Sequence, residues 1–212
     1  MSTKKSRKKK VTAKRREQIL KAALEVFTQK GYAAATIPEI AKAADVAAGT
    51  IYLYYPSKRE LFVSVIKNFI ITPPLLKLIN KIPQGDMDNV FREILKDRLD
   101  LVKNPVFARM LSLMGEVMRD PELKKLWLKE FLQQFLGRIE MGYRMMSATG
   151  KFRRLEPAVA MRAVGGMIIG FLLLRVAEGD TSPLNKLAQE KIAEDIVNLL
   201  LHGLLKQKEN AK

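Results

Sequence analysis

Apolar residues recur at spacings of three and four along almost the whole chain, and alternating β-branched runs are absent. Such spacing places apolar side chains on one face of a helix, so the sequence predicts an all-α protein. Proline, glycine and short polar clusters interrupt the pattern and mark the ends of helices. The predicted helices cover residues 12–30, 36–44, 47–54, 57–71, 75–81, 87–103, 105–118, 121–148, 157–178 and 185–206.

The short helices at 36–44 and 47–54 are joined by a tight turn and have the dimensions of a helix-turn-helix. Thr36 and Glu39 form a capping box at the start of the first helix, and Ser57 and Glu60 form another at the start of helix 57–71. The second box leaves Lys58 beside a helix N-terminus, where phosphate oxygens bind favourably.

Small residues open the second helix of this pair, and they let a helix end approach the floor of the major groove. Thr50 can contact base edges, phosphate or a thymine methyl group, and Tyr52 offers its hydroxyl to a phosphate. The pattern therefore predicts a DNA-reading helix. An ordinary helical hairpin with surface tyrosines is the alternative interpretation.

Charge supports a polyanionic partner. The chain of 212 residues has 38 Lys and Arg against 22 Asp and Glu, which gives a formal net charge of +16. Residues 1–16 carry nine basic side chains and no acidic one, so we expect a flexible basic arm there. Such an arm releases counterions when it binds nucleic acid, and a solubilising tail is the alternative.

Composition argues against several other classes. Without Cys, we expect no disulfide, no thiolate metal site and a reducing cytoplasmic location. The single histidine, His202, is too few for a His-based metal cluster, and the sequence gives no support for a Ser-His-Asp triad. We therefore expect no enzyme, no metal and no cofactor. The longest apolar run, 163–174, is shorter than the roughly 20 residues that cross a bilayer, so we expect no membrane segment.

The ordered run from Thr36 through Gly49, Tyr52 and Lys58 to Leu61 resembles the DNA-binding signature of TetR-family (TetR/AcrR-type) transcriptional regulators. The resemblance implies an N-terminal three-helix helix-turn-helix domain followed by a larger helical bundle for ligand binding and dimerisation. It divides the chain into the basic arm at 1–16, the helix-turn-helix domain at 17–62 and the effector-binding and dimerisation domain at 63–212. The family's DNA contacts fall here on Thr36, Ala48, Gly49, Thr50, Tyr52, Tyr54 and Lys58. The resemblance also implies that Ile51 and Tyr55 belong to the core and anchor the recognition helix.

Three positions depart from the family pattern. Asp45 stands where the turn often has glycine, and a left-handed conformation there costs an Asp about 1 kcal/mol. Ala47 cannot cap the recognition helix with a side-chain oxygen, which removes roughly 1 kcal/mol. Tyr55 replaces the usual Phe, and its hydroxyl needs a hydrogen-bond partner.

The C-terminal body contains most of the methionines together with aromatic side chains, which is typical of an adaptable apolar cavity. With the resemblance, this predicts a small apolar or amphipathic effector bound by Phe107, Met110, Met114, Trp127, Phe131, Phe135, Tyr143 and Met167. Plain core packing of these residues is the alternative.

The last two predicted helices have more apolar surface than one core-facing stripe requires, and glycines on the first of them let backbones approach. We predict a homodimer interface of Gly166, Ile169, Gly170, Leu173, Ile196, Leu199 and Leu200, with burial inside one subunit as the alternative. Two-fold pairing would place the recognition helices about one DNA turn apart, or a multiple of it.

These features together predict a sequence-specific repressor that a ligand releases from a palindromic operator of double-stranded DNA. In this hypothesis, the ligand favours a conformation in which helix 57–71 moves the recognition helices out of register. The alternatives are a sequence-independent DNA-coating protein, for which the basic arm would supply the affinity, and a TetR-type activator.

Overall fold

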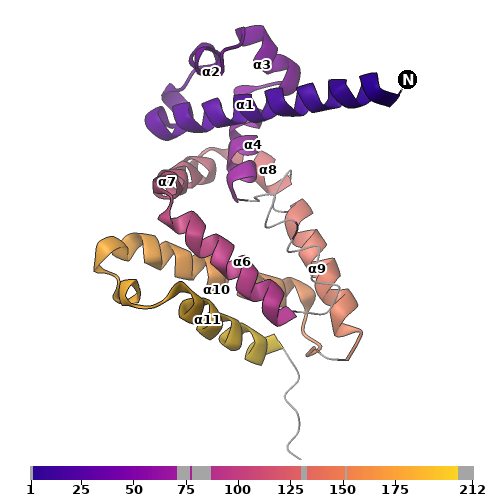
Figure 1. Ribbon diagram of the computed structural model, residues 1–212, viewed down its shortest axis with the longest axis vertical. Helices are drawn as coiled ribbons and strands as arrows, with labels where there is room; N and C mark the ends of the chain where they lie inside the picture. The colour runs from indigo at the N-terminus through magenta and orange to yellow at the C-terminus, as the bar shows by residue number, and fades with distance from the viewer. Residues whose placement is uncertain (1, 71–76, 78–86, 130–132, 151, 205–212) are drawn as a thin grey trace, which may run out of the picture. The chain divides into compact units, whose positions relative to one another are not determined.

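A computed structural model describes residues 2–70, 77, 87–129, 133–150 and 152–204, and at 2–11, 70, 87, 88, 134 and 204 it describes the backbone alone. The predicted all-α class is confirmed, because the described elements are helices (Figure 1). The predicted helix at 75–81 lies outside the described residues except for residue 77.

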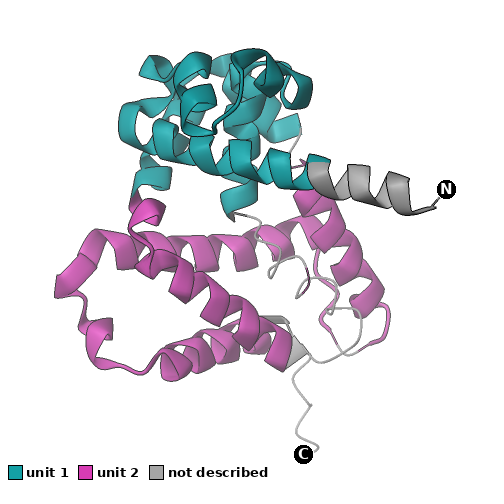
Figure 2. Cartoon of the chain, turned by 45° about the horizontal axis from the view of Figure 1, so that its top comes forward, with its two compact units in different colours: residues 1–71, 109–131 teal, residues 72–108, 132–212 magenta. Residues whose placement is uncertain are grey.

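The chain forms two compact units, which Figure 2 shows in different colours. Unit 1 comprises residues 1–71 and 109–131, and unit 2 comprises residues 72–108 and 132–212. Unit 1 contains α1 (Ser2–Ala34), α2 (Ile37–Ala43), α3 (Ala48–Tyr54), α4 (Lys58–Ile70), most of α7 (Pro105–Arg119) and α8 (Pro121–Trp127). Unit 2 contains α6 (Met87–Lys103), α9 (Gln133–Ser147), α10 (Pro157–Glu178), the 3-10 turns η3 (Gly179–Thr181) and η4 (Pro183–Lys186), and α11 (Gln189–Leu204).

Helix α1 is longer than the sequence pattern indicated. Its backbone is helical from Ser2 onward and so includes the segment for which we expected a flexible basic arm. Lys and Arg are good helix formers, and no Gly or Pro interrupts the chain before Gly31. The apolar spacing used to find helices is missing from the arm, so the pattern alone did not predict its helical backbone. Gly31 has a positive φ, +78°, and marks a kink inside α1.

Two boundaries in the C-terminal half also differ. The predicted helix at 121–148 is described as α8 and α9, on either side of residues 130–132. The predicted helix at 185–206 begins only at Gln189. The hydroxyl of Ser182 accepts a hydrogen bond from the Leu184 N–H at 3.4 Å and starts η4, and Leu187 then adopts an extended conformation before α11.

Unit 1 is built on an aromatic cluster. The rings of Phe27 and Phe62 are fully buried and meet edge to face with centroids 4.9 Å apart, and the Tyr32 ring lies 4.7 Å from that of Phe62. Aromatic pairs of this geometry stabilise by about 0.5–1.5 kcal/mol beyond the area they bury. The cluster joins α1 to α4, and α2 packs on α1 while α3 packs on α2.

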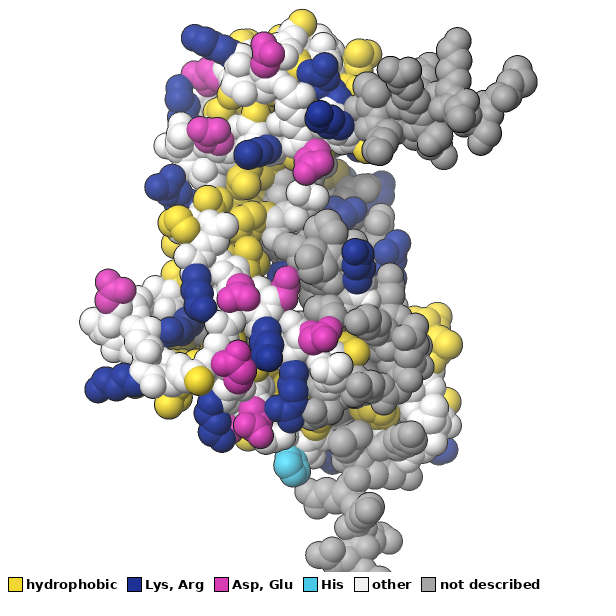
Figure 3. Space-filling view, in the orientation of Figure 1, with side chains coloured by type: hydrophobic (Ala, Val, Ile, Leu, Met, Phe, Trp, Pro, Cys, Tyr) yellow, Lys and Arg dark blue, Asp and Glu magenta, His cyan; other side chains and the backbone are white. Residues whose placement is uncertain are grey.

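In unit 2, α6 packs against α10 and α11, and α9 packs against α10. Leu95 of α6 and Val197 of α11 are fully buried. Lys and Arg are interspersed with Asp and Glu on the molecular face in Figure 3, so the described charges there do not form a patch of one sign.

Helix α10 buries very little of itself within the chain. Only Ala160 and Leu172 of this helix are buried, whereas Val159, Ile169 and Leu174 are 59–65% exposed. The segment Pro157–Thr181 has mean hydropathy 1.9 and is, by length and composition, long enough to cross a membrane. The helix is thus longer than the apolar run 163–174 on which the expectation of no membrane segment rested, and one helix of this kind is weak evidence for a membrane span.

Candidate nucleic-acid interface

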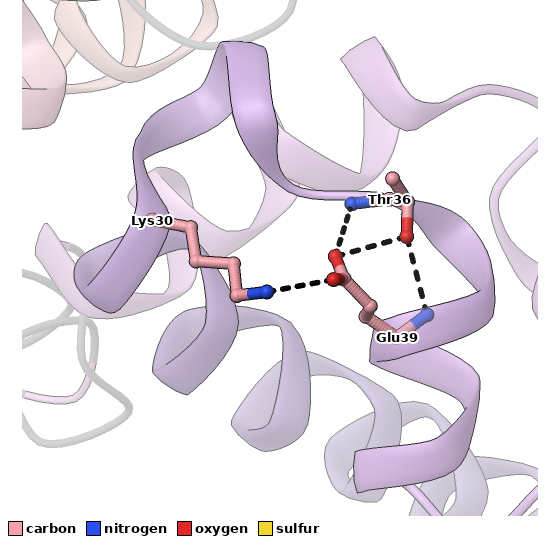
Figure 4. Close-up of polar contacts among 3 residues, drawn as sticks. All are labelled: Lys30, Thr36 and Glu39. Atoms are coloured by element: carbon pink, nitrogen blue, oxygen red, sulfur yellow. Dashed lines mark hydrogen bonds and ion pairs between the residues drawn. The ribbon is translucent and has the colours of Figure 1, made fainter.

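The predicted capping box at the start of α2 is present (Figure 4). The hydroxyl of Thr36 accepts a hydrogen bond from the Glu39 N–H at 3.4 Å, and Glu39 Oε2 accepts from the Thr36 N–H at 3.0 Å and from its hydroxyl at 2.9 Å. Lys30 Nζ of α1 pairs with Glu39 Oε1 at 2.7 Å. The hydrogen bonds from Lys30 and Thr36 lower the pKa of Glu39 from 4.5 to about 2. This box ties the entry of α2 to α1.

The turn between α2 and α3 has the predicted left-handed residue. Asp45 has φ +49°, and the Val46 N–H donates to the Ala41 carbonyl at 3.0 Å. Gln18 Nε2 of α1 donates to the Ala44 carbonyl at 2.6 Å and fixes the same turn from the other side. Sequence patterns did not identify Gln18, because its partner is a backbone group 26 residues away.

Helix α3 is held on one side and open on the other. Ile51 and Tyr55 are buried, as the sequence predicted, and Ala47 makes no side-chain cap at its start. Of the predicted DNA contacts, Gly49 and Tyr52 are exposed and Ala48, Thr50 and Tyr54 are half-buried. The exposed side also contains Leu53, a residue that the sequence analysis did not select.

The hydroxyl of Tyr55 has the partner that its burial requires. Arg16 lies over the ring, with its guanidinium carbon 5.4 Å from the centroid, and it hydrogen-bonds to the hydroxyl. Burial raises the pKa of Tyr55, and Arg16 acts in the opposite direction. The last residue of the basic arm therefore helps to seat the end of α3.

The side chains of Thr36 and Lys58 are already engaged within the chain. The Thr36 hydroxyl is used in the capping box. The Ser57 hydroxyl caps α4 as predicted by accepting from the Glu60 N–H at 3.1 Å, but the adjacent Lys58 side chain contacts the end of α1. Lys58 Nζ lies 4.6 Å from the centroid of the Tyr32 ring and donates to the Ala33 carbonyl at 3.1 Å. Burial lowers the pKa of Lys58, while Glu116 and Glu39 oppose that shift.

A residue of α7 reaches the end of α1. Glu116 Oε2 accepts a hydrogen bond from the Tyr32 N–H at 2.9 Å. A Cβ added at Gly31 would lie 3.0 Å from Glu116 Oε1, so the glycine also provides the space for this carboxylate. Residues 105–108 of α7 belong to unit 2 and its later residues to unit 1, so this helix is continuous through both units. No sequence pattern predicted this contact of Glu116, since nothing local marks a hydrogen bond over 84 residues.

The predicted effector residues are divided between the two units. Met110, Met114 and Trp127 belong to unit 1, whereas Phe107, Phe135, Tyr143 and Met167 belong to unit 2 and Phe131 lies outside the described residues. Tyr143 donates its hydroxyl to the Arg153 carbonyl at 2.7 Å, and Met167 is 44% exposed. Their shared role in ligand binding stays a prediction.

Unit 2 contains a cavity of about 550 Å³ where the end of α6 meets the start of α7, the end of α10 and the start of α11. Its apolar lining includes Leu99, Val176 and Ile192, and its polar lining includes Lys103 and Arg175. None of the residues predicted to bind the effector lines it.

The predicted dimer residues differ in burial, and of the two glycines among them Gly166 is exposed and Gly170 half-buried. Ile169, Leu173 and Leu199 are 44–67% exposed, so they are available to a partner. Ile196 and Leu200 are instead buried inside unit 2, because α11 turns that stripe toward α6. Among the described residues, no group of three or more His, Asp or Glu side chains is placed to hold a metal ion.

Two family models match the sequence. Residues 19–65 match the bacterial regulatory proteins of the tetR family, and residues 89–203 match the C-terminal domain of AefR-like transcriptional repressors. The second match alone spans more than half of the chain, and the first contains α2, α3 and their turn.

Curated relatives match over short segments. The fatty acid metabolism regulator protein of Bacillus subtilis is 46% identical over 50 residues, which is 24% of this chain and 26% of that protein. The HTH-type transcriptional repressor KstR of Mycolicibacterium smegmatis is 46% identical over 52 residues, with the same two shares. The chain thus spans about a quarter to a third of the length of the relatives it matches.

Solved structures match over nearly the whole chain and show the fold. NalD of Pseudomonas aeruginosa, the secondary repressor of the MexAB-OprM multidrug efflux pump, has a TM-score of 0.64 at 22% identity and covers 94% of this chain and 100% of that chain. FadR from Bacillus subtilis in complex with stearoyl-CoA has a TM-score of 0.62 at 22% identity, and the match covers 88% of this chain and 98% of that chain.

Proposed function

Because this chain belongs to the TetR family of bacterial regulatory proteins, we propose that it is a sequence-specific transcriptional repressor of a palindromic operator. The observation that carries the proposal is the geometry of α3. One side of this helix is anchored by buried Ile51 and Tyr55, and the other presents Gly49, Tyr52 and Leu53 to solvent. A rigidly seated helix with a small-residue start fits the major groove.

The remaining contacts follow from this placement. Thr50 reads base edges and Tyr52 donates its hydroxyl to a phosphate, while Thr36, Ala48, Gly49 and Tyr54 line the same approach. Lys58 reaches a phosphate only after its ammonium group leaves the Ala33 carbonyl. The basic segment at 1–16 adds sequence-independent affinity for the DNA backbone.

A homodimer supplies the two-fold symmetry that a palindrome requires. The exposed apolar residues of α10, together with Leu199 of α11, are the surface that a second copy covers. Only 11% of the apolar window in Pro157–Thr181 is buried within one chain, which supports coverage by another surface.

The proposed effector is a small apolar or amphipathic molecule that binds the C-terminal body and releases the DNA. The cavity of about 550 Å³ in unit 2 has the volume of typical small-molecule sites and combines an apolar lining with two cationic side chains. That FadR forms a complex with stearoyl-CoA is a property of that protein, and it supports an effector of this class. Release requires the effector to prefer one of two conformations, typically by about 1–3 kcal/mol.

The test is a fluorescence anisotropy titration of the full-length protein on the DNA upstream of its own gene, at about 150 mM salt. We expect tight binding that a scrambled duplex does not compete away. Tyr52→Ala should weaken binding to every operator variant, while Thr50→Ala should change the base preference. Equal affinity for scrambled DNA, with a steep salt dependence that deletion of residues 1–16 removes, would instead identify a sequence-independent DNA-coating protein.

A further inference from the structure

Two residues of α3 point most directly away from unit 1. Successive residues of an α-helix are rotated by about 100°, so Leu53 lies about 200° and Gly49 about 160° around the axis from fully buried Ile51. Both positions are therefore within about 20° of the outward pole of the helix. They are four residues apart and lie one above the other on the same face.

Leu53 is the most exposed large apolar side chain in the described part of the chain, at 83%. A single exposed leucine is common on protein surfaces, so its exposure alone indicates nothing. Its position is informative, because it occupies the outward pole of the helix proposed to enter a DNA groove. Tyr52 beside it is also 52% exposed, so this part of α3 presents a continuous, partly apolar surface.

Gly49 gives this face its shape. Its φ is not positive, and a Cβ built at Gly49 would meet no heavy atom within 4 Å. Neither the backbone conformation nor packing within unit 1 therefore requires glycine at this position. Without a side chain at Gly49, a surface that approaches α3 from outside can come closer to its first turn than to its second.

We propose that Leu53 reads thymine in the operator through its C5-methyl group, and that Gly49 provides the close approach; this inference rests on the proposed function. The base edges in the major groove present hydrogen-bond donors, acceptors and one apolar group, which is the thymine methyl. A leucine cannot hydrogen-bond, and it would desolvate a polar base edge without compensation. Leu53 is thus a specificity-determining residue that favours thymine at one position of each half-site.

The experiment begins with selection of binding sites from a randomised duplex pool by the full-length protein. In the selected site, each thymine is then replaced in turn by deoxyuridine, which lacks only the C5-methyl group. Affinities of the native chain and of Leu53→Ala are measured on every duplex. For the native chain, we expect one replacement per half-site to weaken binding about fourfold, the effect of losing one buried methyl-sized group. For Leu53→Ala, the same replacement should have no effect.

Two variants serve as controls, and a third tests the role of Gly49. Leu53→Met keeps an apolar side chain and should retain the sensitivity to deoxyuridine. Leu155→Ala removes an exposed leucine outside unit 1 and should bind every duplex like the native chain. Gly49→Ala should weaken binding to all selected sites, because the added methyl group holds the helix away from the groove.

The outcomes separate the two proposals. If no sequence is enriched from the pool, the proposed function fails and the thymine contact fails with it. If a site is enriched but no deoxyuridine replacement matters, or if it matters equally for Leu53→Ala, the protein is sequence-specific and the role assigned to Leu53 is wrong.

Discussion

The helix-turn-helix of unit 1 and helix α10 of unit 2 place their apolar residues differently. In α2, Ile37, Ile40 and Ala41 are buried against the same chain, and polar groups cap the start of the helix. In α10, the apolar residues surround the helix, only Ala160 and Leu172 are buried, and Glu156 makes no side-chain cap. Unit 1 thus satisfies its hydrophobic pattern within one chain, whereas unit 2 leaves much of one helix uncovered.

The difference indicates what each region needs from outside. In α1–α4 of unit 1, the exposed large apolar side chains of the described residues are Tyr52 and Leu53 on α3, the residues proposed to meet DNA. Unit 2 leaves the apolar surface of α10 exposed to solvent, and the proposed homodimer would bury it. A change to a buried residue of unit 1 should therefore affect folding, while a change to an exposed residue of α10 should affect assembly.

The largest expected effect tests whether the aromatic core of unit 1 stabilises its fold. Phe62→Ala removes a fully buried ring from the cluster with Phe27 and Tyr32. We expect unit 1 to lose about 3–5 kcal/mol of unfolding free energy, measured by urea denaturation. Leu53→Ala is the matched control and should stay within about 0.5 kcal/mol, because its side chain is exposed. Equal losses for the two variants would contradict the assignment of the core.

The next largest effect tests whether a second copy of the chain covers α10 of unit 2. Ile169→Glu places a charge on the exposed surface of α10, where a dimer would have to bury it without a partner. We expect a monomer by sedimentation at micromolar concentration and a loss of operator affinity of roughly 100-fold or more, with little change in the helical content. Leu187→Glu, at an exposed leucine between η4 and α11, should leave the dimer intact. A dimer that survives Ile169→Glu would place the interface elsewhere.

A smaller effect concerns the contact between α7 and α1. Glu116→Ala removes the acceptor of the Tyr32 N–H, and we expect a loss of about 1–2 kcal/mol in unfolding free energy. Glu116→Gln keeps an oxygen acceptor and should restore much of that loss. Glu25→Ala, at an exposed position of α1, is the control for removing a carboxylate. If all three variants unfold alike, this hydrogen bond does not stabilise unit 1.

The smallest effect sharpens the role of the α2 cap through pH. Since Glu39 has a pKa of about 2 in the folded chain and 4.5 ordinarily, its ionised form stabilises the fold. This contribution is fully present above pH 4.5 and is lost as the pH falls toward 2. Glu39→Gln should therefore be less stable than the native chain at pH 7, and the difference should shrink at pH 3. A difference that does not change with pH would show that the charge of Glu39 is unimportant.

Local signals in the sequence predicted much of the candidate site. Capping at Thr36 and Ser57, the left-handed Asp45 and the burial of Ile51 were confirmed, because each depends on a few neighbouring residues. Contacts between distant segments were missed, including those of Gln18, Arg16 and Glu116. Their partners are backbone groups or hydroxyls that carry no recognisable pattern.

The sequence by itself determined the helical class, the helix-turn-helix and the family, because hydrophobic period, caps and turn residues act over a few positions. Only the tertiary structure decided that Lys58 turns back toward Ala33, that Ile196 and Leu200 face α6, and that Leu53 and Gly49 point outward. These orientations depend on how each helix is rotated against its neighbours. That rotation is set by packing between segments far apart in the chain, and no short stretch of sequence contains it.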